Sequence, residues 1–162
     1  MTVAVRPATS SPDRVGPAGP PDGRRMRVLL TSTASDAHTW NLVFLQLLIE
    51  ELGHRVRNLG CCVPTGTVLS EMAAYRPDLV VVSSVNGHGH TDGLRLISEL
   101  RANPALAGVP VVIGGKLGID GSPDAAQSRA LLEAGFTAVF DDRASARELE
   151  TYLNHSTSAV GG

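Results

Sequence analysis

The chain has 162 residues, of which 43% are hydrophobic, and this length suits one domain with a two-sided core but not two domains. Its formal net charge of −2 offers no basic field to a phosphate backbone, so we expect no nucleic-acid partner. No apolar run has the form of a signal peptide or the roughly 20 residues of a membrane-spanning helix, which predicts a soluble cytoplasmic protein without a membrane partner.

The amino-terminal 25 residues contain five prolines among Gly, Ser and Arg, a composition typical of a disordered leader. We expect residues 26–155 to form the folded domain and residues 156–162 a flexible tail. The two cysteines, Cys61 and Cys62, are adjacent, so they are poorly placed for a disulfide and lack the spacing of a zinc or redox motif. Two cysteines without a disulfide fit the reducing conditions of the cytoplasm.

From Met26 onward, short β-branched runs alternate five times with amphipathic stretches, which predicts five βα units. The expected strands are Arg27–Thr31, Arg55–Asn58, Leu79–Ser83, Val109–Ile113 and Ala138–Phe140. The expected helices run over about Trp40–Leu52, Gly66–Tyr75, Gly93–Arg101, Pro123–Ala134 and Ser145–Leu153. The third and fourth strands are apolar on both faces, as central parallel strands must be. The chain is therefore predicted to be α/β, a flavodoxin-like, doubly wound, five-stranded parallel sheet of order 2-1-3-4-5.

In this topology, ligands bind beyond the carboxyl ends of the strands. The loop after the first strand carries Asp36 and His38. A carboxylate that holds one ring nitrogen of a histidine leaves the other free as a metal ligand or a base. Two simpler interpretations stay open, because Asp36 is also a good helix N-cap and a lone loop histidine is usually just solvated.

The loops after the third and fourth strands carry further candidate groups. Ser83 and Ser84 end the third strand, where their hydroxyls can bond a ligand or the loop backbone. Gly114-Gly115 follows the fourth strand, and two residues without a Cβ let a bulky ligand approach the backbone. A response-regulator receiver has the same topology, but it requires an aspartate where Ser83 and Ser84 stand.

The stretch Gly87–Gly93 nearly matches a dinucleotide-binding fingerprint, but its last spacing is one residue too long and it follows the wrong strand. A plainer interpretation is a loop that ends in an Asp92 helix cap. His88 and His90 lie in this stretch and provide, with His38, a weak candidate zinc site.

Together the three loops resemble the cobalamin-binding domain of base-off, His-on corrinoid proteins, whose pattern is Asp-x-His-x-x-Gly, then Ser-x-Leu, then Gly-Gly. The matching segments are Asp36-Ala37-His38, Ser83-Ser84-Val85 and Gly114-Gly115. Ser35 and the glycines after the third strand make the small subunit of glutamate mutase (methylaspartate mutase) the nearest resemblance, over about Met26–Asn154. The chain departs from the pattern at two positions. Asn41, preceded by the bulky Trp40, stands in place of the glycine, and Val85 stands in place of the leucine.

The resemblance implies roles for these residues. His38 Nε2 would be the lower axial ligand of cobalt in place of the cofactor's dimethylbenzimidazole, and Asp36 would hold Nδ1. The displaced nucleotide tail would enter the sheet between the loops, with Ser83 or Ser84 bonded to the base and Gly114-Gly115 leaving room. The cofactor-binding set implied by the resemblance is Ser35, Asp36, Ala37, His38, Thr39, Ser83, Ser84, Val85, Gly114, Gly115, Lys116, Leu117 and Gly118.

The resemblance also implies an activity. The domain would supply adenosylcobalamin to a large barrel-type mutase subunit that carries the substrate site. The hetero-oligomer would then be an isomerase that interconverts L-glutamate and threo-3-methylaspartate, with no catalytic residue on this chain. Three alternatives stay open: a corrinoid carrier for methyl transfer, a cobalamin-sensing module, and a domain whose site is closed by Trp40 and Asn41. Methyl carriers of this type usually bring a helical cap domain, and only the proline-rich leader precedes this domain.

Overall fold

A computed structural model describes residues 25–84, 88–115, 125–140 and 145–160, and these form five βα units in chain order. The strands are β1 (Arg27–Ser32), β2 (Arg55–Asn58), β3 (Leu79–Ser83), β4 (Val111–Gly114) and β5 (Ala138–Phe140). The helices are α1 (Thr39–Glu51), α2 (Thr65–Tyr75), α3 (Gly89–Ala102), α4 (Ala125–Ala134) and α5 (Ser145–Val160). No helix in these ranges is long and apolar enough to cross a membrane.

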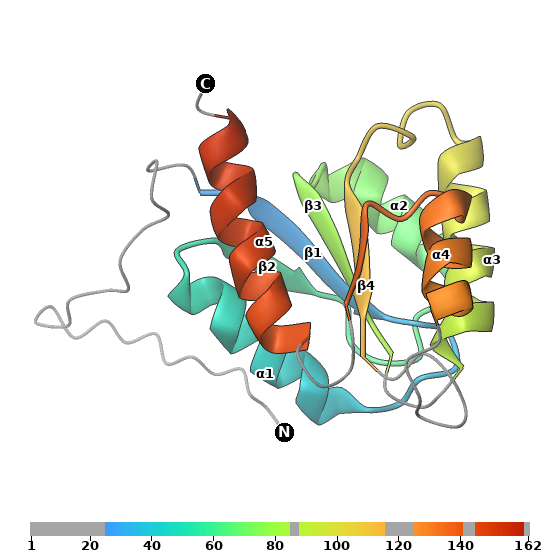
Figure 1. Cartoon of the computed structure of the whole chain (residues 1–162), viewed down its shortest axis with the longest axis horizontal. Coiled ribbons are helices and arrows are strands. Elements are labelled where there is room, and N and C mark those ends of the chain that lie inside the picture. Colours follow the sequence, from blue (N-terminus) through green and yellow to red (C-terminus); the bar gives the residue numbers. More distant parts are fainter. Residues whose placement is uncertain (1–24, 85–87, 116–124, 141–144, 161–162) are drawn as a thin grey trace, which may run out of the picture.

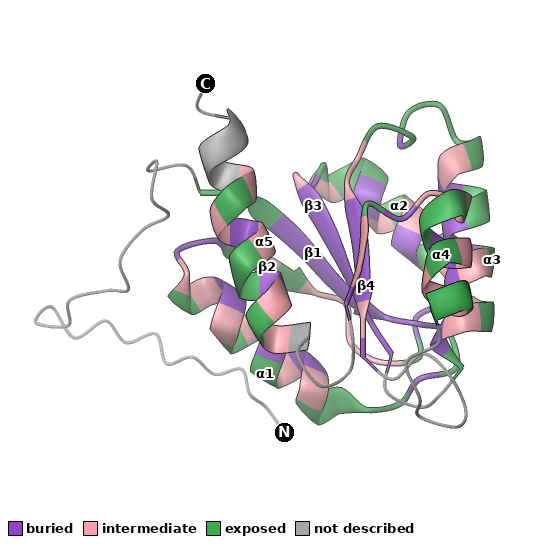
Figure 2. Ribbon diagram, in the orientation of Figure 1, coloured by how far each residue is buried: buried purple, intermediate pink, exposed green. Residues whose placement is uncertain are grey.

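All five strands are parallel and lie in the order β2-β1-β3-β4-β5, which confirms the predicted doubly wound, flavodoxin-like sheet (Figure 1). Two interior strands, β1 and β3, pair over five residues, from Val28 with Leu79 to Ser32 with Ser83. They are almost wholly buried because helices cover both faces of the sheet (Figure 2).

Strand alternation divides the core between the two faces. Odd-numbered β1 residues such as Leu29 pack against α2, α3 and α4, together with Val80, Val82 and Ile113 of the next strands. Even-numbered β1 residues such as Leu30 pack against α1 and α5. This second cluster also contains Leu42, Leu45 and Ile49 of α1, Val81 of β3, Val112 of β4, Phe140 of β5, and Leu149 and Leu153 of α5.

Several element boundaries differ from the sequence prediction, and three of these differences have a physical explanation. The strand β4 begins at Val111 rather than Val109, because Pro110 has no N–H to give to the ladder. The helix α5 continues past Leu153 to Val160, since neither Gly nor Pro follows before Gly161. The third difference, an α3 that begins four residues early at Gly89, changes the surroundings of the candidate site and is described below.

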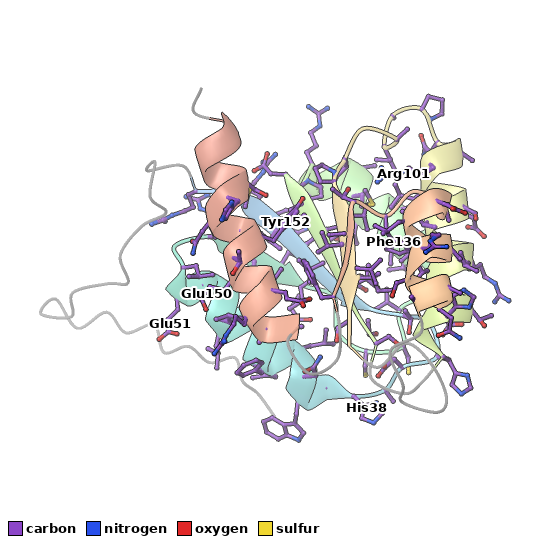
Figure 3. The ribbon with its side chains drawn as sticks, in the orientation of Figure 1. His38, Glu51, Arg101, Phe136, Glu150 and Tyr152 are labelled. Atoms are coloured by element: carbon purple, nitrogen blue, oxygen red, sulfur yellow. The ribbon has the colours of Figure 1, made fainter. Side chains whose placement is uncertain are left out.

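Two contacts fix α3 against its neighbours. A Cβ at Gly93 would lie 2.9 Å from Ile113 Cδ1 and 3.2 Å from Leu131 Cδ2, so glycine permits the close approach of α3 to β4 and α4. At the other end of α3, the Arg101 guanidinium donates to the carbonyl oxygens of Ala107, Val109 and Gly135 over 2.7 to 3.0 Å (Figure 3). The Gly93 contact holds the beginning of α3 near the carboxyl edge of the sheet, and the Arg101 contacts fix the end of the helix.

Candidate functional site

Three strand ends meet at the carboxyl edge of the sheet. Ser32 of β1 pairs in register with Ser83 of β3, and Ser83 pairs with Gly114 of β4. The Ser84 amide also donates to the Gly114 carbonyl over 3.0 Å. The loops that the sequence singled out therefore leave the sheet from neighbouring points.

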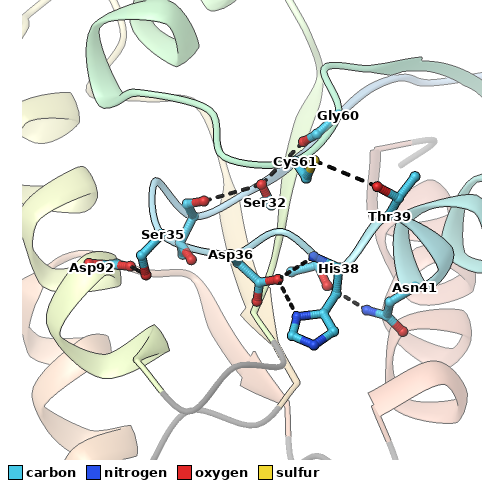
Figure 4. A network of polar contacts seen from close by, with 11 residues as sticks. Ser32, Ser35, Asp36, His38, Thr39, Asn41, Gly60, Cys61 and Asp92 are labelled. Carbon is cyan, nitrogen blue, oxygen red and sulfur yellow. Dashed lines mark hydrogen bonds and ion pairs between the residues drawn. The ribbon is translucent and has the colours of Figure 1, made fainter.

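The centre of the site is the pair formed by Asp36 and His38 (Figure 4). One carboxylate oxygen, Asp36 Oδ1, lies 2.9 Å from His38 Nδ1 and accepts the His38 backbone N–H over 2.9 Å. The Asp36 side chain is 2% exposed, whereas the His38 side chain is 58% exposed. The buried carboxylate thus fixes the imidazole in orientation and leaves its second nitrogen, Nε2, at the surface.

The alternative that Asp36 caps the first helix is wrong. The N-cap of α1 is His38, whose own side chain makes no cap hydrogen bond. The Asp36 carboxylate instead accepts the amide of His38 itself, two residues along the chain, as in an Asx turn. This hydrogen bond therefore fixes the backbone at His38 and does not cap the first turn of α1.

Neighbouring elements hold the Asp36–His38 loop on two sides (Figure 4). The Ser35 hydroxyl donates to the Asp92 carboxylate in the first turn of α3. From the loop after β2, the Cys62 amide donates to the Asp36 carbonyl over 2.8 Å, and Cys61 Sγ lies 3.6 Å from the Thr39 hydroxyl. Ala37, the remaining predicted residue of this loop, is exposed.

The start of α3 at Gly89 corrects the prediction that Asp92 caps this helix. The Asp92 amide donates to the His88 carbonyl over 3.0 Å and closes the first turn of α3. Gly89 is acceptable at the start of α3 because the amides of the first turn have no partner within the helix. The Asp92 carboxylate, also in the first turn, is stabilised by the helix dipole. Asp92 is therefore free to accept the bond from Ser35.

Ser83 and Ser84 are both buried, 4% and 0% exposed. Alternation places Ser83 on the face covered by α1 and α5, after Val81, and Ser84 on the opposite face, after Val82. Beside them, Gly115 is buried with a φ of +107°, a backbone conformation that residues with a side chain rarely adopt. Glycine at this position is thus required by the backbone.

Asn41, in the first turn of α1, was not among the predicted cofactor-binding residues. Its amide Nδ2 donates to the Ser83 hydroxyl oxygen across 42 residues of sequence. The sequence could have indicated Asn41 through its position, one residue before the buried stripe of α1 that begins at Leu42. A half-buried asparagine there faces the sheet rather than solvent.

Several predicted residues lie outside the described part of the chain: Val85, Lys116, Leu117 and Gly118. His88 is exposed, and His90 is half-buried with its Nε2 unbonded among the described residues. Within the same residues, no three His, Cys, Asp or Glu side chains come together as a metal site, so His88 and His90 do not form one with His38.

The residues present fit a corrinoid whose cobalt takes a histidine ligand. An oriented and exposed imidazole can serve as a cobalt ligand, and the carboxylate behind it fixes the orientation of the ring. The Thr33 hydroxyl, 2% exposed, has no hydrogen-bond partner among the described residues, which is unusual for a buried polar atom. The Ser83 hydroxyl accepts from Asn41 and keeps its own O–H to donate to a ligand.

Comparison with known proteins agrees with this chemistry. A family model described as B12 binding domain matches residues 26–149. The glutamate mutase sigma subunit of Halobacterium salinarum is 32% identical over 115 residues, which cover 70% of this chain and 74% of that protein. Glutamate mutase sigma subunit 1 of Haloarcula marismortui is 31% identical with the same coverage.

Solved structures share the fold. A cobalamin-binding protein from Desulfitobacterium hafniense superposes with a TM-score of 0.61 at 18% identity, over 80% of this chain and 60% of that one. The methanol:cobalamin methyltransferase complex of Methanosarcina barkeri gives a TM-score of 0.62 at 16% identity, over 79% of this chain and 46% of that one. The chain therefore spans less than two thirds of either solved chain.

Proposed function

The chain belongs to the B12-binding domain family, and from that membership we propose that it is the cobalamin-binding subunit of a carbon-skeleton mutase of the glutamate mutase type. The sigma-subunit relatives support this proposal because their matched region includes most of both chains. The proposed reaction interconverts L-glutamate and threo-3-methylaspartate, and the complex would be an isomerase.

One observation carries the proposal: the buried Asp36 carboxylate holds Nδ1 of the exposed His38 ring at 2.9 Å. We propose that His38 Nε2 is the lower axial ligand of cobalt and that the base of the cofactor is displaced. Asp36 would orient the ring and fix its tautomer. When bound, adenosylcobalamin supplies radical chemistry through homolysis of its cobalt–carbon bond.

The displaced nucleotide tail is proposed to lie at the ends of β3 and β4. The Ser83 hydroxyl would bond the base, and Gly114 and Gly115 would admit it because neither carries a Cβ. Ser35, Ala37 and Thr39 would border the corrin in the loop that carries His38. Ser84, Val85, Lys116, Leu117 and Gly118 complete the proposed set from the neighbouring strand ends and loops.

The substrate site is proposed to lie on a partner, a large barrel-type subunit in a hetero-oligomer. No residue of this chain is assigned to substrate, so its own work is to bind and orient the cofactor. We propose that residues 26–155 carry this function in the cytoplasm. The predicted flexible tail is wrong as far as Val160, because α5 continues to that residue.

The test is the electron paramagnetic resonance spectrum of cob(II)alamin bound to this protein, prepared with natural-abundance and with ¹⁵N-labelled histidine. A histidine nitrogen on cobalt changes the superhyperfine splitting from a triplet to a doublet when ¹⁵N replaces ¹⁴N. We expect that change in the native protein and in a His155→Ala control, which alters an exposed residue of α5. We expect its loss in His38→Ala. A splitting that ignores the label would refute the axial role of His38.

A second candidate is a non-catalytic corrinoid protein, either a methyl carrier or a cobalamin sensor. The shared fold of the methyltransferase complex from Methanosarcina barkeri is the observation that keeps it open. Both candidates predict the same cobalt ligand, so spectroscopy does not separate them. Assay of glutamate isomerisation after reconstitution with a glutamate mutase large subunit does, because only a mutase subunit restores turnover with adenosylcobalamin.

A further inference from the structure

The helix α1 presents apolar side chains to solvent as well as to the sheet. Its inner face packs into the core between the sheet, α1 and α5. On the outer face, Trp40, Phe44 and Leu47 follow one another at spacings of four and three residues and are 70%, 53% and 49% exposed. We call these three residues the α1 stripe. A surface helix ordinarily carries polar side chains outward, so an apolar outer face indicates that another surface covers it.

The surroundings of the α1 stripe carry no charge. Apart from His38, no side chain between Asp36 and Glu50 is ionisable. Glu51, one turn beyond Leu47, is the charged residue at which the stripe ends. Enrichment in aromatic side chains and depletion of charge are typical of the core of a protein–protein interface.

The α1 stripe begins at the candidate site. Trp40 stands in the first turn of α1, two residues after the N-cap His38. Figure 1 shows that α1 begins at the carboxyl edge of the sheet and runs back from it. At the rise of an α-helix, the stripe extends about 10 Å from Trp40 to Leu47. A protein that covers the cofactor-binding edge can therefore cover the stripe as well.

The size of the α1 stripe distinguishes between possible occupants. Three side chains are far fewer than the roughly 20–30 residues that each partner contributes to a stable interface, so the stripe is the margin of a larger contact and does not by itself hold a second copy of the chain. Residues 1–24 contain no leucine, isoleucine or aromatic residue that could match it. The adjoining surface that needs a partner is the cofactor-binding edge.

We infer that the α1 stripe is a docking surface for the large mutase subunit, which covers it with an uncharged, apolar face of its own. This inference rests on the proposed function, because that function requires a large subunit whose substrate site faces the cofactor. Trp40 is the part of the stripe nearest to His38, and Phe44 and Leu47 extend the contact along α1. Large exposed aromatic residues of this kind contribute much of the binding energy where they become buried.

The experiment observes Trp40 directly, because it is the single tryptophan of the chain. The full chain is labelled with 5-fluorotryptophan and loaded with adenosylcobalamin. Its ¹⁹F resonance is recorded before and after addition of the unlabelled glutamate mutase large subunit of the same organism. The shift of the resonance between light and heavy water measures the exposure of the indole. We expect an exposed indole in the free and the cofactor-loaded chain and a protected one in the complex.

The second measurement is the dissociation constant of the loaded chain and the large subunit. Phe44→Ala and Leu47→Ala should each weaken this binding by about tenfold. Leu132→Ala is the matched control, because Leu132 is similarly exposed, at 46%, but lies in the last turn of α4, and it should leave the constant unchanged. All three variants should bind adenosylcobalamin as the native chain does, which shows that they fold.

An indole that stays exposed in an active complex, or native affinity in both Phe44→Ala and Leu47→Ala, would overturn the inference and leave the proposed function intact. An indole already protected before the large subunit is added would overturn it as well, since the chain, a second copy or the cofactor would then cover the stripe. Failure of the loaded native chain to bind the large subunit and restore glutamate isomerisation would overturn both the inference and the proposed function.

Discussion

The Ser35 hydroxyl donates a hydrogen bond to the Asp92 carboxylate and so ties the loop that carries His38 to the first turn of α3. The two residues are 57 positions apart, and their elements leave the sheet from β1 and β3. The exposed end of the loop is thereby fixed to a helix whose own position is set by the close packing of Gly93 on β4.

Removal of the Ser35–Asp92 hydrogen bond should lower the stability of the protein only slightly. Ser35→Ala loses one exposed hydrogen bond, so we expect the free energy of unfolding to fall by about 1 kcal/mol or less. Asp92→Ala should cost somewhat more, because it also removes a favourable charge from the N-terminal turn of α3. Urea unfolding of both single variants and the double variant measures the coupling. Strictly additive losses would show that the bond contributes nothing.

The carboxylate behind His38 should matter more for cofactor affinity than this tie. Asp36→Ala leaves both His38 nitrogen donors without their acceptor, and loss of such a supporting group typically costs about ten- to a hundredfold in metal affinity. Asp36→Asn keeps an oxygen acceptor but not the charge, so its loss should be smaller. Titration with adenosylcobalamin, followed by the absorbance change to the base-off form, should give affinities that decrease from the native protein to Asp36→Asn and then to Asp36→Ala. Native affinity in the alanine variant would show that the contact has no role in binding.

Much of the sheet could be predicted from the sequence because its signals are local. The runs that became β3 and β4 are apolar on both faces and end in serine or glycine, and their order followed from five repeated βα units. The start of α3 was missed because Gly87-His88-Gly89 has the composition of a loop. Helix formation there depends on packing that composition does not report.

The candidate site was predictable in part for the same reason. The Asp36–His38 contact spans two residues, so the motif itself indicated it. The Asn41–Ser83 bond joins residues 42 positions apart and exists only because α1 packs over the end of β3. The choice between Ser83 and Ser84 likewise depends on which face of β3 each residue occupies. Such relationships require the tertiary arrangement.

Gly93→Ala tests the close packing of α3 on β4. The added Cβ would approach Ile113 Cδ1 to 2.9 Å, and overpacking of this kind costs about 1–3 kcal/mol, partly offset by about 1 kcal/mol of helix propensity. We therefore expect a net loss of about 1 kcal/mol in unfolding free energy. In an Ile113→Val background the Cδ1 atom is gone and only the 3.2 Å approach to Leu131 Cδ2 stays tight, so the same substitution should cost less. Denaturant unfolding of the four proteins checks this, and an equal loss in both backgrounds would contradict the steric explanation.

The Cys62 thiol beside the site should ionise at a higher pH than an ordinary cysteine side chain does. Desolvation raises the pKa of the Cys62 thiol, and the neighbouring Cys61 thiol and Asp36 carboxylate raise it further. A raised pKa favours the protonated thiol, so at any given pH the reactive thiolate fraction of Cys62 is smaller than that of an ordinary cysteine.

Alkylation by iodoacetamide, followed by peptide mass spectrometry, measures this directly. We expect modification of Cys62 to be slow near pH 7 and its rate to rise only above the usual cysteine range, although the residue is exposed. Cys61→Ser removes the neighbouring thiol, one of the groups that raise the pKa of Cys62, and should move the midpoint of the rate profile to lower pH. An unfolded control in urea should titrate at the ordinary value. A native midpoint at or below that of the unfolded chain would contradict the effect, since every group that acts on Cys62 here favours the protonated form.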